Sequence, residues 1–216
     1  LLKKTFESDD VLKAHSERLI DNVKLISNKY SPFTFCMSEK GDQLSQWRGY
    51  CPPSGGYAVG FNQTCLHTFA DKQGFNLHPC IYLHSEHQAL LKPLIMPLLL
   101  VLVQDLDRSL NNFVTKFVQI APMIKHSSFS EEREWRLVSG VFATDRPDCK
   151  VRAGRTMLIP YSDFSIGIKS NSALCQIIVG PAQHQHLSGS SISSALHKEN
   201  IRDWSISYSQ SPFREW

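Results

Sequence analysis

Two short segments, 38–50 and 131–136, contain the residues best suited to chemistry. Each places an arginine directly after a tryptophan, as Trp47-Arg48 and as Trp135-Arg136. A guanidinium and an aromatic ring can hold a base between them, and the guanidinium also binds phosphate through two parallel hydrogen bonds. The pattern therefore predicts a ligand site between the two segments.

The second segment also contains two carboxylates. On a strand, Glu132, Glu134 and Arg136 would share one face, with the two carboxylates within about 7 Å of each other. One carboxylate can then accept a hydrogen bond from a ribose hydroxyl while the other stabilises positive charge that develops on a sugar. The alternative is structural: a buried ion pair between Glu134 and Arg48 that joins two strands, with the tryptophans in the core.

Other chemistries find little support in the sequence. The six cysteines contain no C-x-x-C pair, and no P-loop, G-x-G-x-x-G, H-E-x-x-H or G-x-S-x-G motif occurs. Two histidine pairs, at 84 and 87 and at 184 and 186, have no carboxylate at ligand spacing, so we expect solvated loop histidines. The sequence predicts no metal site and reduced thiols.

The composition predicts a folded protein with a hydrophobic core and a small positive net charge. The 216 residues are 42% hydrophobic and 20% charged, with a net charge of +3, which excludes disordered and fibrous classes. Lys150, Arg152 and Arg155 form a small basic patch, either a solvated loop or a landing site for the phosphate of NAD or of a nucleic acid.

The apolar run from Leu94 to Val103 is about half as long as a bilayer span requires. We therefore expect a buried helix there and no membrane partner. Because the stretch from Leu1 to Asp10 is charged and not apolar, we expect a cytoplasmic protein.

Hydrophobic periodicity predicts a single α+β domain over residues 1–216, with a mixed or antiparallel sheet and a helical insertion at about 86–124. The insertion should be interrupted near Pro93 and Pro97. Helices are also predicted at 9–28, up to Tyr50 and at 187–200. The predicted strands are 31–38, 57–61, 79–83, 134–138, 156–160, 175–179 and 203–208.

These elements carry a motif set that resembles a bacterial domain family of unknown function. The W-x-x-Y signature occurs at 47–50, and a small-residue strand follows at 56–61. The family's E-x-E-W-R, I-P-Y and I-x-x-G-P motifs occur at 132–136, 159–161 and 177–181. The resemblance covers about Thr34 to Pro181 and implies a phage-defence or toxin context without implying a reaction.

A second resemblance, to ADP-ribosyltransferases, supplies a reaction. It implies that NAD is the substrate, that Glu134 is the catalytic carboxylate and that Glu132 orients the acceptor. It also implies that Ser38 and Tyr50 contact the nicotinamide side. That superfamily holds the dinucleotide with an Arg or His on its first strand. The expected segment is missing or unrecognisable here, and Arg48 is the hypothetical substitute for that residue.

The leading expectation is an ADP-ribosyltransferase-like toxin or phage-defence effector that modifies a protein or nucleic-acid target, with an antitoxin or defence partner. Trp47 would belong to the NAD site, and Arg48 and Arg136 would clamp phosphate or carboxylate groups. The alternative is a non-catalytic nucleotide-sensing or interaction module in a defence complex, in which the Arg-Trp-Glu cluster is an interior network.

Overall fold

The computed structural model describes residues 30–52, 54–100, 106–143, 149–168 and 171–212, together with positions 17, 20, 21 and 23–25. Contacts divide the chain into two compact units. The first comprises Leu1–Phe35, Cys80–Phe129 and Val138–Ser162, and the second comprises Cys36–Pro79, Ser130–Leu137 and Asp163–Trp216. The dividing points fall inside β1 (Tyr30–Ser38) and β4 (Glu134–Ala143), so both strands contribute residues to both units.

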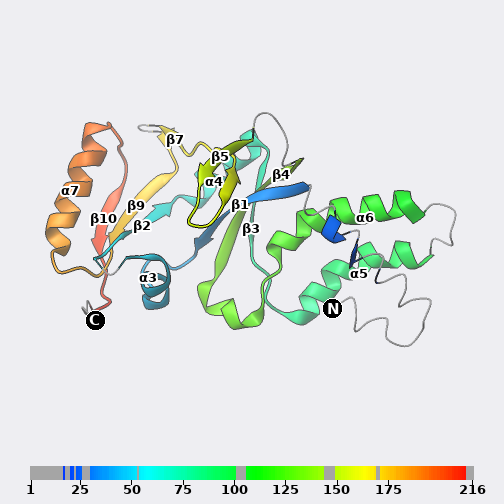
Figure 1. Ribbon diagram of the computed structural model, residues 1–216. Helices are drawn as coiled ribbons and strands as arrows, with labels where there is room; N and C mark the ends of the chain where they lie inside the picture. The colour runs from blue at the N-terminus through cyan, green and yellow to red at the C-terminus, as the bar shows by residue number, and fades with distance from the viewer. Residues whose placement is uncertain are drawn as a thin grey trace. The chain divides into compact units, whose positions relative to one another are not determined.

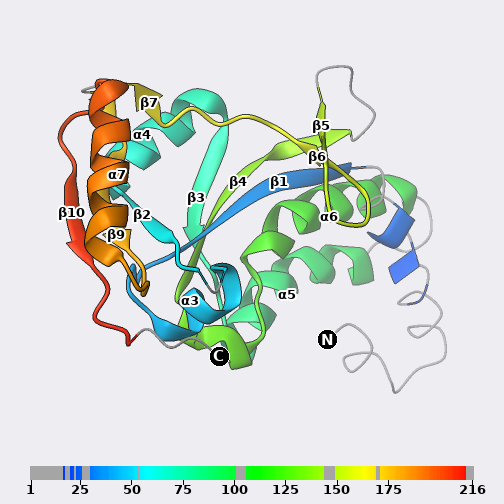
Figure 2. The same ribbon diagram turned by 60° about the vertical axis from the view of Figure 1, so that its left-hand side comes forward.

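The second unit contains a mixed sheet of order β10-β9-β2. Its central strand, β9 (Leu174–Val179), pairs in parallel with β10 (Ser205–Tyr208) and antiparallel with β2 (Tyr57–Phe61). The apolar run that forms β9 is largely buried, as expected of a central strand. Helix α7 (Gln185–Lys198) lies beside this sheet in both ribbon views (Figures 1 and 2).

A second part of this unit packs around an apolar cluster. Asn62 caps helix α4 (Gln63–Gln73) by accepting a hydrogen bond from the Cys65 amide at 3.0 Å. Strand β3 (Phe75–Pro79) follows and belongs to a sheet of order β1-β4-β3. A two-stranded sheet of β7 (Gly167–Ile168) and β8 (Asn171–Ser172) completes the unit. The buried cluster consists of Leu66, Ala70, Leu77, Leu137 and Ala173.

The first unit is built around two helices that lie side by side in both views, α5 (His84–Leu100) and α6 (Leu106–Ile120). Three buried residues of α6, Phe113, Val114 and Val118, form its core. Two 3-10 helices, η1 (Ala121–Met123) and η2 (Ser127–Glu132), follow α6, and η2 continues into the second unit. Strands β5 (Lys150–Ala153) and β6 (Leu158–Tyr161) form a two-stranded antiparallel sheet.

The α+β class is confirmed, as are the helices in the 86–124 insertion, the short helix α3 (Leu44–Tyr50) and the strand at 57–61. The single-domain division stays a prediction. The predicted helix at 9–28 lies mostly outside the described residues, and its six described positions are helical.

Three local predictions are wrong. The strand predicted at 79–83 is absent, because β3 ends at Pro79 and only Ile81 forms a bridge, to Ile124. Helix α5 continues through Pro93 and Pro97, so the expected interruption does not fall at either proline. The basic stretch at 150–153 is a strand and not a loop.

His87 is not a solvated loop residue. It is buried in α5, and its Nε2 lies 2.6 Å from the Ile81 carbonyl oxygen. The imidazole ring therefore hydrogen-bonds to the backbone of the loop that precedes the helix. The six cysteines are free. In the described part of the chain, no helix has both the length and the apolar character that crossing a bilayer requires.

Candidate ligand site

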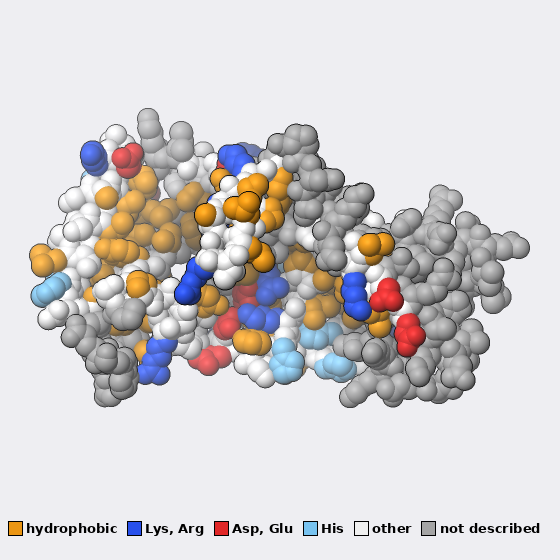
Figure 3. Space-filling model, in the orientation of Figure 1, with side chains coloured by type: hydrophobic (Ala, Val, Ile, Leu, Met, Phe, Trp, Pro, Cys, Tyr) orange, Lys and Arg blue, Asp and Glu red, His pale blue; other side chains and the backbone are white. Residues whose placement is uncertain are grey.

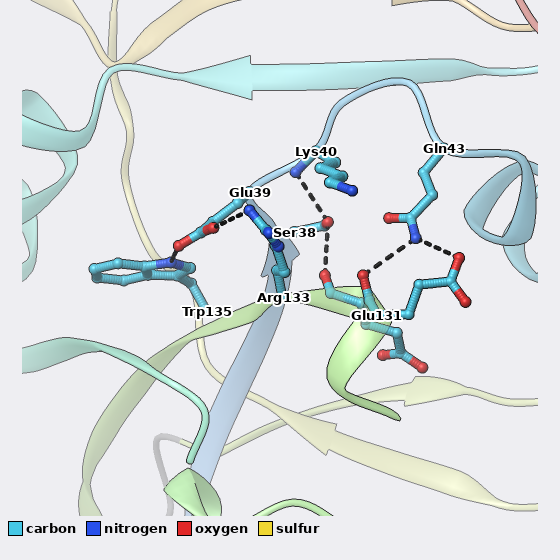
Figure 4. A network of polar contacts seen from close by, with 8 residues as sticks. Ser38, Glu39, Lys40, Gln43, Glu131, Arg133 and Trp135 are labelled. Carbon is cyan, nitrogen blue, oxygen red and sulfur yellow. Dashed lines mark hydrogen bonds and ion pairs between the residues drawn. The ribbon is translucent and has the colours of Figure 1, made fainter. Parts of the chain in front are cut away.

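The two segments singled out in the sequence lie against each other in the second unit. The Glu39 amide donates to the Arg133 carbonyl at 3.1 Å, and the Ser38 hydroxyl donates to the Glu132 carbonyl at 2.8 Å. Ser38 Oγ also accepts a hydrogen bond from the Lys40 amide at 3.1 Å. Figure 4 shows this network, which connects the end of β1 to the turn between η2 and β4. Ser38 is therefore engaged with backbone on both sides.

Gln43 and Glu131 form the other half of the network. Gln43 Nε2 donates to the Glu131 carbonyl at 3.1 Å and to Glu131 Oε1 at 2.7 Å, and the Ser45 hydroxyl donates to the same carboxylate at 3.1 Å. The hydrogen bonds from Gln43 and Ser45, with the nearby Lys40 charge, lower the pKa of Glu131. Because both Glu131 bonds fix the orientation of the amide, Gln43 Oε1 is left buried without a partner among the described residues.

The expectation that Glu132, Glu134 and Arg136 share one strand face is wrong for Glu132. Glu132 is the last residue of η2, and β4 begins only at Glu134. Between them Arg133 has a φ of 43°, in the left-handed region, so the chain changes direction there. Strand periodicity therefore does not relate the two glutamates.

Glu134 forms an ion pair with Arg136, two residues further along β4. Arg136 Nε lies 2.8 Å from Glu134 Oε1, and Arg136 Nη2 lies 3.3 Å from Oε2, so both carboxylate oxygens are engaged. The Glu134 side chain is 6% exposed and that of Arg136 19% exposed. The anticipated ion pair of Glu134 therefore exists, but its partner is Arg136 and not Arg48.

Trp135 points to the other side of β4. Its Nε1 donates to Glu39 Oε1 at 2.8 Å, and its ring packs against the buried apolar cluster that contains Leu66 and Leu137. Arg133 Nη1 lies 3.8 Å from Glu39 Oε2, with both side chains about half exposed, so this surface pair contributes little to stability. The contacts of Trp135 are those of a core residue with a satisfied indole N–H.

Trp47 is also a core residue. It is 8% exposed, and its Nε1 donates to Asp42 Oδ1 at 2.7 Å. Asp42 also accepts hydrogen bonds from the Ser209 hydroxyl and, at 2.9 Å, from the Gln210 amide. Burial alone would raise the pKa of Asp42, but the bonds from Ser209, Trp47, Gln210 and Ser211 lower it overall. Asp42 thereby connects α3 to the segment after β10.

Arg48 and Tyr50 behave differently from the rest of the set. Arg48 is exposed on α3, and Tyr50 is 75% exposed at the end of that helix. Neither side chain hydrogen-bonds to another described residue. Of the predicted site residues, these two are the ones that present their functional groups to solvent.

The structure thus joins Ser38 to the 131–134 segment but buries the chemically active groups of Glu134 and Trp47. The sequence reasoning missed Gln43, Ser45 and Ser209. Gln43 and Ser45 meet Glu131, and Ser209 meets Asp42, only through the fold, so no local pattern marks them. Over the described residues, His, Cys, Asp and Glu side chains form no cluster of three or more that could hold a metal ion.

A domain described as "Protein of unknown function (DUF2971)" is found at residues 46–137. This range is less than half of the chain; it contains the motifs at 47–50, 56–61 and 132–136 but not those at 159–161 and 177–181. The resemblance to a family of unknown function is confirmed over this range, while its defence context stays a prediction. Neither the curated proteins nor the solved structures contain a match.

Proposed function

We propose that the second unit is a non-catalytic nucleotide-sensing or interaction module. The observation that supports this proposal is the state of Glu134, which is 5% exposed and bonded by two nitrogens of Arg136. A carboxylate that stabilises a sugar cation must reach the substrate, whereas this one is engaged inside the protein. Its pairing with Arg136 suits a structural role.

The ligand of this module would be recognised from α3. An exposed guanidinium at Arg48 and an exposed ring at Tyr50 are the groups that bind phosphate and stack on a base. A sensor that responds to a nucleotide and acts through a defence partner would fit the phage-defence context that the sequence resemblance implies.

The test is equilibrium binding of ATP, ADP-ribose and NAD, each measured separately by titration calorimetry. Removing Arg48 and Tyr50 together, as R48A/Y50A, should weaken binding by at least about tenfold, because both the phosphate and the base contact are lost. Arg202→Ala is the matched control, since Arg202 is an exposed arginine of the same unit outside α3. Absence of binding to all three nucleotides would contradict the proposal.

ADP-ribosyl transfer remains the second candidate, and one observation favours it. Ser38 and the 131–134 segment are both assigned to the NAD site by the ADP-ribosyltransferase resemblance. They are neighbours through the 2.8 Å bond between Ser38 Oγ and the Glu132 carbonyl. For catalysis, Glu134 would have to exchange Arg136 for the ribose hydroxyl, so the bidentate pair must open when NAD binds.

The two candidates differ in what Glu134→Gln does. A transferase would lose NAD consumption and target labelling while the variant remained folded. A binding module would consume no NAD in either form, and the variant would be less stable because Arg136 loses its counter-charge in a buried site. Measuring NAD turnover and thermal unfolding on the same preparations separates these outcomes.

A further inference from the structure

The basic stretch at 150–155 belongs to a two-stranded hairpin in the first unit. β5 and β6 pair antiparallel, with Val151 opposite Pro160 and Ala153 opposite Leu158. Among the described residues this sheet has no third strand. A two-stranded hairpin is only marginally stable without a further strand or an apolar cover. Each outer edge of the hairpin is therefore a candidate surface for pairing with a further strand.

The pairing pattern shows which edge can accept another strand. The Gly154 amide donates to the Met157 carbonyl at 2.9 Å, which makes 154 and 157 a hydrogen-bonded pair. Since hydrogen-bonded and non-hydrogen-bonded pairs alternate, the N–H and C=O groups of Val151 and Ala153 point outward from β5. On β6 the equivalent outward positions are Leu158 and Pro160, and Pro160 has no N–H to donate. The edge of β5 is therefore the better one for pairing.

The two faces of the hairpin differ in chemistry. Val151, Ala153, Leu158 and Pro160 share one face and are exposed, Val151 at 58% and Leu158 at 72%. Lys150 and Arg152 lie on the opposite face, and Arg155 lies in the loop. Figure 3, in the orientation of Figure 1, shows hydrophobic side chains at the surface over this hairpin.

We propose that the outer edge of β5 binds an extended peptide that alternates acidic and apolar residues. Such a strand would bond to the outward N–H and C=O groups of Val151 and Ala153, lay its apolar side chains beside Val151, and place a carboxylate beside the exposed Arg152. A flat membrane surface would meet only one of the two faces. Pairing with a second copy of the same edge would bring like charges together.

The test uses the full chain and a fluorescent peptide that alternates Glu and Val, followed by fluorescence anisotropy. We expect saturable binding that weakens as salt rises, because the carboxylate contacts are exposed and screened. A peptide of the same composition with the Glu and Val residues in separate blocks should bind at least about tenfold more weakly, as should the alternating peptide N-methylated on the bonding edge.

Two variants of the chain test whether the peptide binds at the edge of β5. Arg152→Glu reverses the charge and should weaken binding by at least about tenfold, and Val151→Pro should do the same by removing an outward donor. Lys72→Glu, at an exposed lysine on α4, makes the same change in net charge as Arg152→Glu and should leave binding unchanged.

Equal binding of the block and alternating peptides would overturn the proposal. So would binding that survives both variants, or co-sedimentation with phosphatidylserine vesicles in place of peptide binding. If the protein self-associates and Val151→Pro abolishes this association, the edge of β5 binds a second copy of the chain. That result would also overturn the proposal of an acidic peptide partner.

Discussion

Strands β4 and β5 both carry charged residues two positions apart, and they use them in opposite ways. On β4, Glu134 and Arg136 neutralise each other in a largely buried site. On β5, Lys150 and Arg152 share a face and have the same sign. The difference follows from position and composition: β4 is the central strand of its sheet and contains a carboxylate beside its arginine, whereas β5 has one paired neighbour and contains no acid. Arg136 is therefore held by a residue of its own strand, whereas Arg152 is exposed.

The largest effect should come from breaking the pair on β4. Glu134→Ala leaves the Arg136 guanidinium in a site where its own side chain is 19% exposed. Removing one partner of a buried pair costs about 3–5 kcal/mol, so the free energy of unfolding should fall by that amount. Urea denaturation followed by circular dichroism measures it.

A double variant tests whether the charge or the packing is responsible. Replacing both residues, as E134L/R136M, removes both charges of the pair and should recover most of the lost stability. If Glu134→Ala changed the free energy of unfolding by less than about 1 kcal/mol, the pair would not be structural and the second candidate function would gain support.

The second effect concerns the close packing beneath Trp47. A Cβ at Gly180 would lie 2.8 Å from the Trp47 ring and 3.0 Å from the Gly56 carbonyl oxygen. Gly180→Ala should therefore cost about 1–3 kcal/mol through overpacking. Gly49→Ala is the matched control, because Gly49 lies in α3 with no atom within 4 Å of its added Cβ.

The control variant, Gly49→Ala, should change the stability in the opposite direction. Alanine in a helix interior is favoured over glycine by about 0.5–1 kcal/mol, so Gly49→Ala should raise the melting temperature slightly. Equal losses in both variants would indicate that the contact between Gly180 and Trp47 does not limit packing.

Much of the fold was predictable because its strands are marked by local patterns. The apolar run of β9 and the alternation at 57–61 needed no tertiary information. The strand at 79–83 failed because Ile81 finds only Ile124 as a partner, which local periodicity cannot show. The length of β4 was also underestimated, since its continuation to Ala143 depends on pairing with distant segments.

The sequence predicted which segments lie together at the candidate site, but it did not predict the contacts that each side chain makes there. The proximity of the Ser38 and Glu132 segments was anticipated from residue type alone. The direction of each side chain was not, because the left-handed Arg133 separates Glu132 from the strand and Ser209 reaches Asp42 from the other end of the chain. Such long-range contacts leave no signal in one sequence.

The third effect is a pH dependence centred on Asp42. Its pKa is lowered below the ordinary value of 3.8 in the folded protein, so the ionised form is the one that folding favours. The corresponding stability is present above pH 3.8 and is lost as the pH falls through the lower folded pKa. Asp42→Asn should lower the melting temperature at pH 7 and flatten its fall in acid. An unchanged acid profile would assign the dependence to other carboxylates.

The smallest effect should come from β5. Because Arg152 is exposed and its hairpin face carries charges of one sign only, Arg152→Ala should change the free energy of unfolding by no more than about 0.5 kcal/mol. A stabilising change that disappears at high salt would indicate relief of repulsion with Lys150. A loss comparable to that of Glu134→Ala would show that Arg152 is satisfied within the chain, and the contrast between the two strands would not hold.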